Sequence, residues 1–177
     1  MNPHILALIL AVALPTALCG GEPVQLSESD RTALLEKSKA TQHAFDTGDA
    51  DAIIQSTHPA ILKFFATREQ FEATTRKAVE SLKGQVVVEK SDWGDPTPVY
   101  ESGDDEVCFV PKTSIMRVGP TRARAEGFLI AAREKGTNEW FFLDCDGLRK
   151  DSSLLRKLFP DLPKEVPLPP NTIEVLK

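Results

Sequence analysis

The spacing of apolar residues divides the chain into a helical first half and a second half of strands. Apolar residues recur every three or four positions from residue 31 onwards, and again after residue 70. Ser27 and Thr67 each stand three residues before an acidic or amide residue, as in the capping boxes that begin helices. The pattern predicts helices that end near Gly48, His58 and Lys83.

After Gly84 the pattern becomes that of β-strands. A short strand is expected over residues 85–89, followed by a turn or loop over residues 92–96. Longer strands are expected over residues 106–118, 122–134 and 139–146. Pro111 lies within the first of these and cannot donate to a ladder, so we expect it at an edge or a bulge.

The end of the chain combines a short helix with a proline-rich segment. Asp151 is a candidate cap for the helix, and the prolines of residues 160–170 favour an extended backbone. This segment is either a strap packed on the body or a displayed recruitment ligand. We favour the strap, because it contains side chains that suit burial, namely Leu162, Val166 and Leu168.

The first residues are typical of a targeting segment. Ile5–Leu14 is an unbroken apolar run, shorter than the roughly 20 residues that span a bilayer. It has the length of the apolar core of a signal peptide, and small residues at Ala17 and Cys19 favour cleavage after Cys19. We therefore expect export to the periplasm or beyond. Lipidation of Cys19 is the less favoured alternative, because the bulky Leu18 precedes it.

These observations predict one domain with attached segments. We expect a signal peptide over residues 1–19, a linker over 20–29, the domain over 30–159 and a packed tail over 160–177.

Composition and charge exclude several classes of partner. The 177-residue chain has a formal net charge of −5 and no concentrated basic patch, so nucleic acid is not expected as a partner. No second apolar run approaches membrane-spanning length, so stable membrane insertion after cleavage is not expected either. A small apolar ligand, a protein partner or a second copy of the chain in a homodimer are the partners that the sequence leaves open.

Cys108 and Cys145 remain after cleavage, and an even number in an oxidising compartment suggests a disulfide. The strand pattern argues against one. It places Cys108 opposite Ala131 and Cys145 opposite Phe128, on either side of the middle strand. Two strand spacings are roughly 10 Å, whereas bridged Cα atoms lie within about 7 Å. We therefore predict two free thiols.

Helices followed by antiparallel strands predict an α+β protein with helices on one face of a curved sheet. Residues 45–53 resemble the first helical hairpin of the NTF2-like superfamily, the cone shared by ketosteroid isomerase and scytalone dehydratase. Residues 67–71 and 139–142 resemble its third helix and a late strand, and residues 58–59, 140–142 and 158–163 are similar to a group of exported bacterial proteins of unknown function. The resemblance covers most of residues 30–170. It implies a conical pocket between helices and sheet, without specifying an activity.

The resemblance does not extend to the catalytic groups of ketosteroid isomerase, which are an Asp base and an oxyanion hole of Tyr and protonated Asp. The position of the tyrosine corresponds to Thr41, and that of the base to Pro59 and Ala60. Glu126 is the carboxylate nearest to the third position. None of these residues supplies the required group.

Asp144 and His58 are the weak catalytic candidates. Asp144 alternates with Trp140 and Phe142, so the three share one sheet face and Asp144 is either a pocket acid or a solvent-facing strand end. His58 is fifteen residues from His43, which matches no metal-binding spacing, and a structural role is favoured. No metal and no cofactor are expected. The expected ligand pocket comprises Thr41, Phe45, Trp140, Phe142 and Asp144.

Taken together, the sequence favours an exported, non-catalytic binding or interaction module. One alternative is a small-molecule lyase, isomerase or hydrolase that uses Asp144 or His58 in the cone. Another is a protein-binding inhibitor or a dimer formed through the open face of the sheet. An enzyme requires two or more polar groups that converge in a deep apolar pocket, and a binding module requires a pocket with one polar group or none. A protein binder requires a large exposed apolar patch on the sheet instead.

Overall fold

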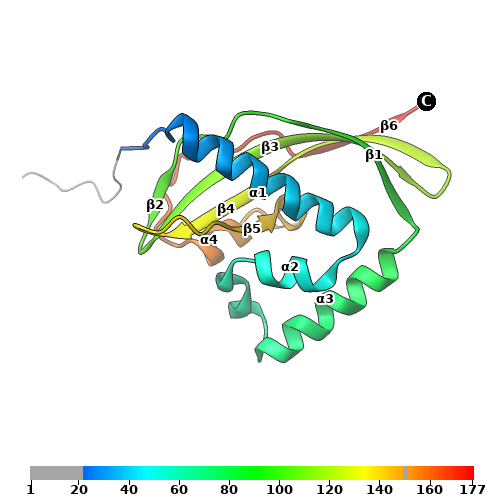
Figure 1. Ribbon diagram of the computed structural model, residues 1–177, viewed down its shortest axis with the longest axis horizontal. Helices are drawn as coiled ribbons and strands as arrows, with labels where there is room; N and C mark the ends of the chain where they lie inside the picture. The colour runs from blue at the N-terminus through cyan, green and yellow to red at the C-terminus, as the bar shows by residue number, and fades with distance from the viewer. Residues whose placement is uncertain (1–21, 150) are drawn as a thin grey trace, which may run out of the picture.

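A computed structural model describes residues 22–149 and 151–177 (Figure 1). The predicted signal peptide and the alternative lipidation of Cys19 lie outside these residues. The described chain is an α+β protein with one open antiparallel sheet of six strands.

Helices occupy the first part of the chain, as the sequence predicts. They are α1 (Glu28–Thr47), α2 (Ala50–Ser56), the 3-10 helix η1 (Pro59–Phe64) and α3 (Arg68–Leu82). The side chains of Ser27 and Thr67 cap α1 and α3 by accepting from backbone N–H groups three residues on, at 3.1 and 3.2 Å. Gly48 ends α1 in the left-handed conformation, with φ of 73°. The predicted ends of the helices are therefore confirmed, and their cause is local capping.

The sheet is built around one long hairpin. Its strands are β1 (Val86–Trp93), β2 (Tyr100–Ser102), β3 (Asp105–Val118), β4 (Thr121–Glu134), β5 (Phe141–Asp144) and β6 (Thr172–Leu176). The order is β1-β3-β4-β5, while β2 pairs with β3 and β6 pairs with β4. One edge of β3 pairs with β1 as far as Lys112 and with β2 from Val107 onwards, and Pro111 lies in the unpaired stretch between them. The carbonyl of Pro111 accepts a hydrogen bond from Gly94 N at 2.9 Å. Its predicted place at an interruption of the ladder is confirmed.

Three strand predictions were wrong in extent. β1 continues to Trp93 through residues predicted as a loop, because Trp93 pairs with Lys112 and packs on the core below α1. β5 ends at Asp144, where the chain turns into the 3-10 helix η2 (Cys145–Arg149). The end of the tail returns as β6, antiparallel to residues 122–126 of β4.

Both faces of the sheet are covered at the end that holds β2 and β5. One cluster below α1 contains Leu34, Cys108, Val110, Leu129, Trp140 and Phe142. The cluster on the other face contains Phe109, Phe128, Ile130, Leu155, Phe159 and Leu162. It is covered by η1, η2, α4 (Leu154–Leu158) and the strap, so the expectation of helices on one face only was wrong. The signal was the continuous apolar runs of residues 107–110 and 128–132, which are typical of strands buried on both faces.

The proline-rich segment begins as a packed strap. Phe159 and Leu162 are buried, and the guanidinium of Arg156 donates to the carbonyl oxygens of Leu162 and Pro163. Leu168 is 46% exposed, so its predicted burial was wrong. The cap of α4 is Ser153, and Asp151 instead accepts from Ser153 N at 2.9 Å.

The two cysteines are free thiols buried on opposite faces of the sheet. Cys108 pairs with Ala131 as predicted, and Cys145 Sγ accepts from Phe128 N at 3.2 Å. Burial raises the pKa of Cys108 to about 12 and that of Cys145 to about 11. Both are therefore protonated thiols without nucleophilic character at neutral pH.

Candidate functional site

A cavity of about 370 Å³ lies between the C-terminal ends of α1 and α3 and the side of the sheet that faces α1. Its apolar wall consists of Phe45, Val79, Leu82, Val86, Val88 and Met116. Its polar wall includes Gln42, Asp46, Lys112, Asp144 and Asp146. A concave, largely apolar site with a few convergent polar groups has the character of a small-molecule site.

Lys112 is the centre of the polar wall. It continues the face of β3 that carries Cys108 and Val110 and reaches towards α1, with its side chain 14% exposed. Its ammonium donates to Gln42 Oε1 at 2.6 Å and to Asp144 Oδ2 at 3.0 Å. Gln42 in turn donates through Nε2 to Asp46 Oδ1 at 2.8 Å. These bonds compensate a desolvated charge and connect α1 to two strands.

Asp144 and Asp146 stand side by side at the entrance to η2. Asp144 Oδ1 accepts from Asp146 N at 2.8 Å, and the carboxylate of Asp146 pairs with Arg149 at 2.5 Å. Partial desolvation and the negative charge of Asp144 raise the pKa of Asp146, and Arg149 opposes the shift. The site therefore contains two neighbouring carboxylates, one paired with Lys112 and the other with Arg149.

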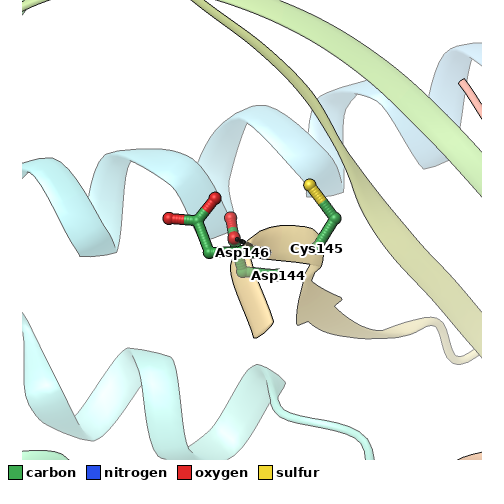
Figure 2. A group of neighbouring side chains, drawn as sticks. All are labelled: Asp144, Cys145 and Asp146. Carbon is green, nitrogen blue, oxygen red and sulfur yellow. Dashed lines mark hydrogen bonds between the residues drawn. The ribbon is translucent and has the colours of Figure 1, made fainter. Parts of the chain in front are cut away.

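Cys145 lies between these two acids, and one ligand atom from each of the three residues falls within 4.8 Å of the others (Figure 2). Three features make this group a poor metal site. Lys112 and Arg149 already bind the two carboxylates, and the thiol, with its pKa of about 11, accepts a hydrogen bond from Phe128. Metal coordination would require a thiolate and would have to displace both cations.

The structure brings together two of the five predicted pocket residues. Phe45 and Asp144 line the cavity, whereas Thr41 is a buried residue of α1 that does not line it. Trp140 and Phe142 are core residues, and the guanidinium of Arg133 lies 4.5 Å from the ring centre of Trp140. Asp144 lies on the α1-facing side of the sheet, as Trp140 and Phe142 do. Its carboxylate forms an ion pair with the ammonium of Lys112.

His58, the other catalytic candidate, is buried outside this cavity. Its Nδ1 accepts from Ala60 N at 3.2 Å and so caps η1. Its Nε2 lies 3.8 Å from a carboxylate oxygen of Asp105, and the centre of its ring lies 5.4 Å from that of Phe159, which ends α4 just before the strap. Burial lowers the pKa of His58, and Asp105 offsets part of the shift. The arrangement is that of a structural histidine.

A second cavity, of about 310 Å³, lies on the other face of the sheet between η1, η2 and α4. Ile61, Phe64, Leu148, Leu154 and Leu158 make its lining mainly apolar. Asp144 also borders this cavity and is its one charged lining residue, so the cavity lacks the several convergent polar groups of the first. We assign it no function and use it below as a control site.

Lys112, Gln42 and Asp146 were missed by reasoning from sequence. The available signal was Lys112 itself, the one charge among the even positions from Cys108 to Val118, which are otherwise apolar or uncharged. Its partner Gln42 is 70 residues away in the chain, and no local pattern connects the two.

Comparisons with protein-family models, with curated proteins and with solved structures each gave no match. Within the described residues, no helix combines the length and the apolar character needed to cross a membrane.

Proposed function

We propose that the protein is an exported, non-catalytic binding module of NTF2-like fold that takes a small amphipathic molecule in the cavity between α1, α3 and the sheet. The observation that carries the proposal is the division of this cavity into an apolar wall and a polar wall centred on Lys112. The apolar run Ile5–Leu14 supports export.

The order of elements supports the NTF2-like part of the proposal. Helices α1 to α3 precede the antiparallel series β1-β3-β4-β5, and α1 covers one face of this sheet (Figure 1). The cavity lies between these helices and the sheet, where the resemblance implies a conical pocket.

The cavity has more polar groups than the one or none expected of a binding module, and binding without catalysis is favoured because these groups are bonded to one another. Lys112 is held by Asp144 and Gln42, so its ammonium is engaged in structural bonds. Thr41, Pro59 and Ala60 supply neither a phenol nor a carboxylate where the resemblance would require them. A positioned acid or base contributes about 10²–10⁴-fold to a rate, so the absence of these groups removes most of such an activity.

The enzymatic alternative is supported by one observation, the raised pKa of Asp146 beside Asp144 at the cavity. A carboxyl group whose pKa is raised beside a second carboxylate is typical of acid–base sites. A reaction carried by this pair would be lost in Asp146→Asn while ligand binding persisted.

The proposal is tested by filling each cavity in turn and measuring the binding of octylamine by calorimetry. Met116→Trp occupies the candidate site, and we expect it to weaken binding at least tenfold. Leu148→Trp occupies the second cavity and is the matched control, with no expected change. Thermal unfolding verifies that both variants fold. Absence of binding to the unmodified protein, or equal losses in the two variants, would contradict the proposal.

A further inference from the structure

We propose that the ligand is a single-chain amphiphile, an inference that rests on the function proposed above. Its head group, an amine or hydroxyl that donates hydrogen bonds, binds at the Lys112–Asp144 end of the cavity. Its hydrocarbon chain leaves the cavity along β1 and β3 and lies on the α1-facing side of the sheet beyond the end of α1.

This second surface, called here the distal face, follows from the strand register. Val88, Met116, Ala123 and Val175 occupy one row across β1, β3, β4 and β6, and Val118 and Ile173 flank this row. Between Lys112 and the hairpin turn, the described residues of β1, β3, β4 and β6 on this side are uncharged, and Lys177 follows β6. The opposite side of the same strands carries Arg117, Arg122, Arg124, Glu126 and Glu174.

The distal face continues the floor of the cavity. Val88 and Met116 line the cavity and also belong to the central row of the face. The neighbouring side chains are open to solvent, with Val118 46%, Ile173 55% and Val175 63% exposed. In Figure 1 the tip of the β3–β4 hairpin, with β1 and β6, projects past the end of α1. Within the central row, Val88 and Met116 are half-buried and Ala123 is buried, so the exposed side chains lie around the edge of the face. Because this apolar surface continues the floor of the cavity, it is a candidate site for a hydrocarbon chain.

The length of the path suits a lipid-sized chain. Six residues of β3 separate Lys112 from Val118, which corresponds to about 20 Å at the rise of a strand. The hydrocarbon of one membrane leaflet is about 15 Å thick, half of the bilayer core. An acyl or alkyl chain of that length therefore fits between the polar wall and the tip of the hairpin.

The area of the distal face argues against a second copy of the chain as its occupant. Four strands and about five residues of each give roughly 300 Å² from the standard strand spacing and rise. A stable protein interface buries about 800 Å² on each partner. The face is too small for a dimer and large enough for one hydrocarbon chain.

Hydrogen bonding at the polar wall selects the head group. Asp46, Asp144 and Asp146 present carboxylate oxygens there, and their charge is balanced by Lys112, Arg149 and Lys83. The ammonium of Lys112 is already bonded to Asp144 and Gln42. An amine or hydroxyl head group can donate to the carboxylate oxygens, whereas a carboxylate or phosphate head group has no donor to offer them.

The first test compares ligands on the unmodified protein by calorimetry, below their micelle concentrations. Affinity should rise about fourfold for each methylene from octylamine to dodecylamine, because each buried methylene contributes about 0.8 kcal/mol. Dodecylamine and dodecanol should each bind at least tenfold more tightly than dodecanoate. Tighter binding of dodecanoate would overturn the assignment of the head group.

The second test uses two substitutions of equal exposure on opposite sides of the sheet. Val118 and Val87 are both 46% exposed, and Val87 pairs with Arg117 on the side away from α1. Val118→Asp should weaken the binding of dodecylamine at least tenfold and leave the binding of octylamine unchanged. Val87→Asp should change neither value.

The outcomes separate this inference from the proposed function. If octylamine binds but longer chains give no gain, or if Val118→Asp and Val87→Asp behave alike, the inference fails and the proposed function stands. If no amphiphile binds, both fail. If sedimentation shows a dimer that Val118→Asp dissociates, the distal face is a protein interface and the inference is overturned.

Discussion

The two halves of the β3–β4 hairpin share one backbone conformation but differ in how far their side chains are buried. In the half near β2 and β5, both sides of the strands are apolar and buried, as at Phe109 and Cys108. In the half near the turn, the strands alternate, with Val118 on one side and Arg117 on the other. The ends of α1 and α3 border only the cavity over Val88 and Met116, and the sheet projects past the end of α1 (Figure 1). A continuous apolar run thus predicts two covering layers, whereas alternation predicts one apolar surface that needs a partner. In this chain the alternating half provides the floor of the candidate site.

The largest expected effect tests how much the doubly covered half contributes to the free energy of unfolding. Phe109 is completely buried, and its ring lies edge-on to Phe128 with 5.5 Å between the ring centres. Phe109→Ala should lower the free energy of unfolding by about 3–5 kcal/mol, because the cavity adds to the lost burial. Denaturant titration measures this value. A loss below about 1 kcal/mol would show that the doubly covered half does not form the principal core.

The polar wall gives the next largest effect. The ammonium of Lys112 bonds to Asp144 and Gln42, and the lysine side chain is only 14% exposed. Asp144→Ala removes the first of these two partners and leaves Gln42. We expect a loss of about 2 kcal/mol, because an uncompensated and largely buried charge is costly. Lys112→Met removes the charge and should cost less. The double variant, measured by denaturant titration, should resemble Lys112→Met. Equal losses in the two single variants would contradict this account.

A pH titration tests the contact between the strap and the rest of the covered half. Burial lowers the pKa of His58 below its ordinary 6.5. As the pH falls below 6.5 the unfolded chain takes up a proton that the folded chain does not, so stability should fall by up to about 1.4 kcal/mol per pH unit. The loss should level off once the folded histidine is protonated.

His58→Asn retains a side chain that can cap η1 without titrating, and it should flatten this slope. His43→Asn, on the exposed side of α1, is the matched control and should leave the slope unchanged. A slope that persists in His58→Asn would assign it to other groups.

The same contrast explains what reasoning from sequence could reach. Helix ends depend on nearby caps such as Ser27 and Gly48, and the register that pairs Cys108 with Ala131 depends on a tight turn between adjacent strands. These signals are local, and the predictions from them were confirmed. β6 pairs with a strand about 50 residues earlier, and Lys112 meets Gln42 across 70 residues. Tertiary packing determines both contacts, so the polar wall of the site could not be assembled from the sequence.

The smallest expected effect decides whether the distal face is open in solution. Val118→Thr keeps the shape and the strand propensity of a residue that is 46% exposed. Its effect on unfolding should stay within about 0.5 kcal/mol, as for other surface substitutions. Denaturant titration at two protein concentrations a hundredfold apart measures it, with Val87→Thr as the matched control on the opposite side. Because a dimer is stabilised by mass action, a covered face would make the midpoint depend on concentration and would enlarge the loss. Concentration-independent unfolding together with equal small losses in the two variants would leave the apolar face free for a small ligand.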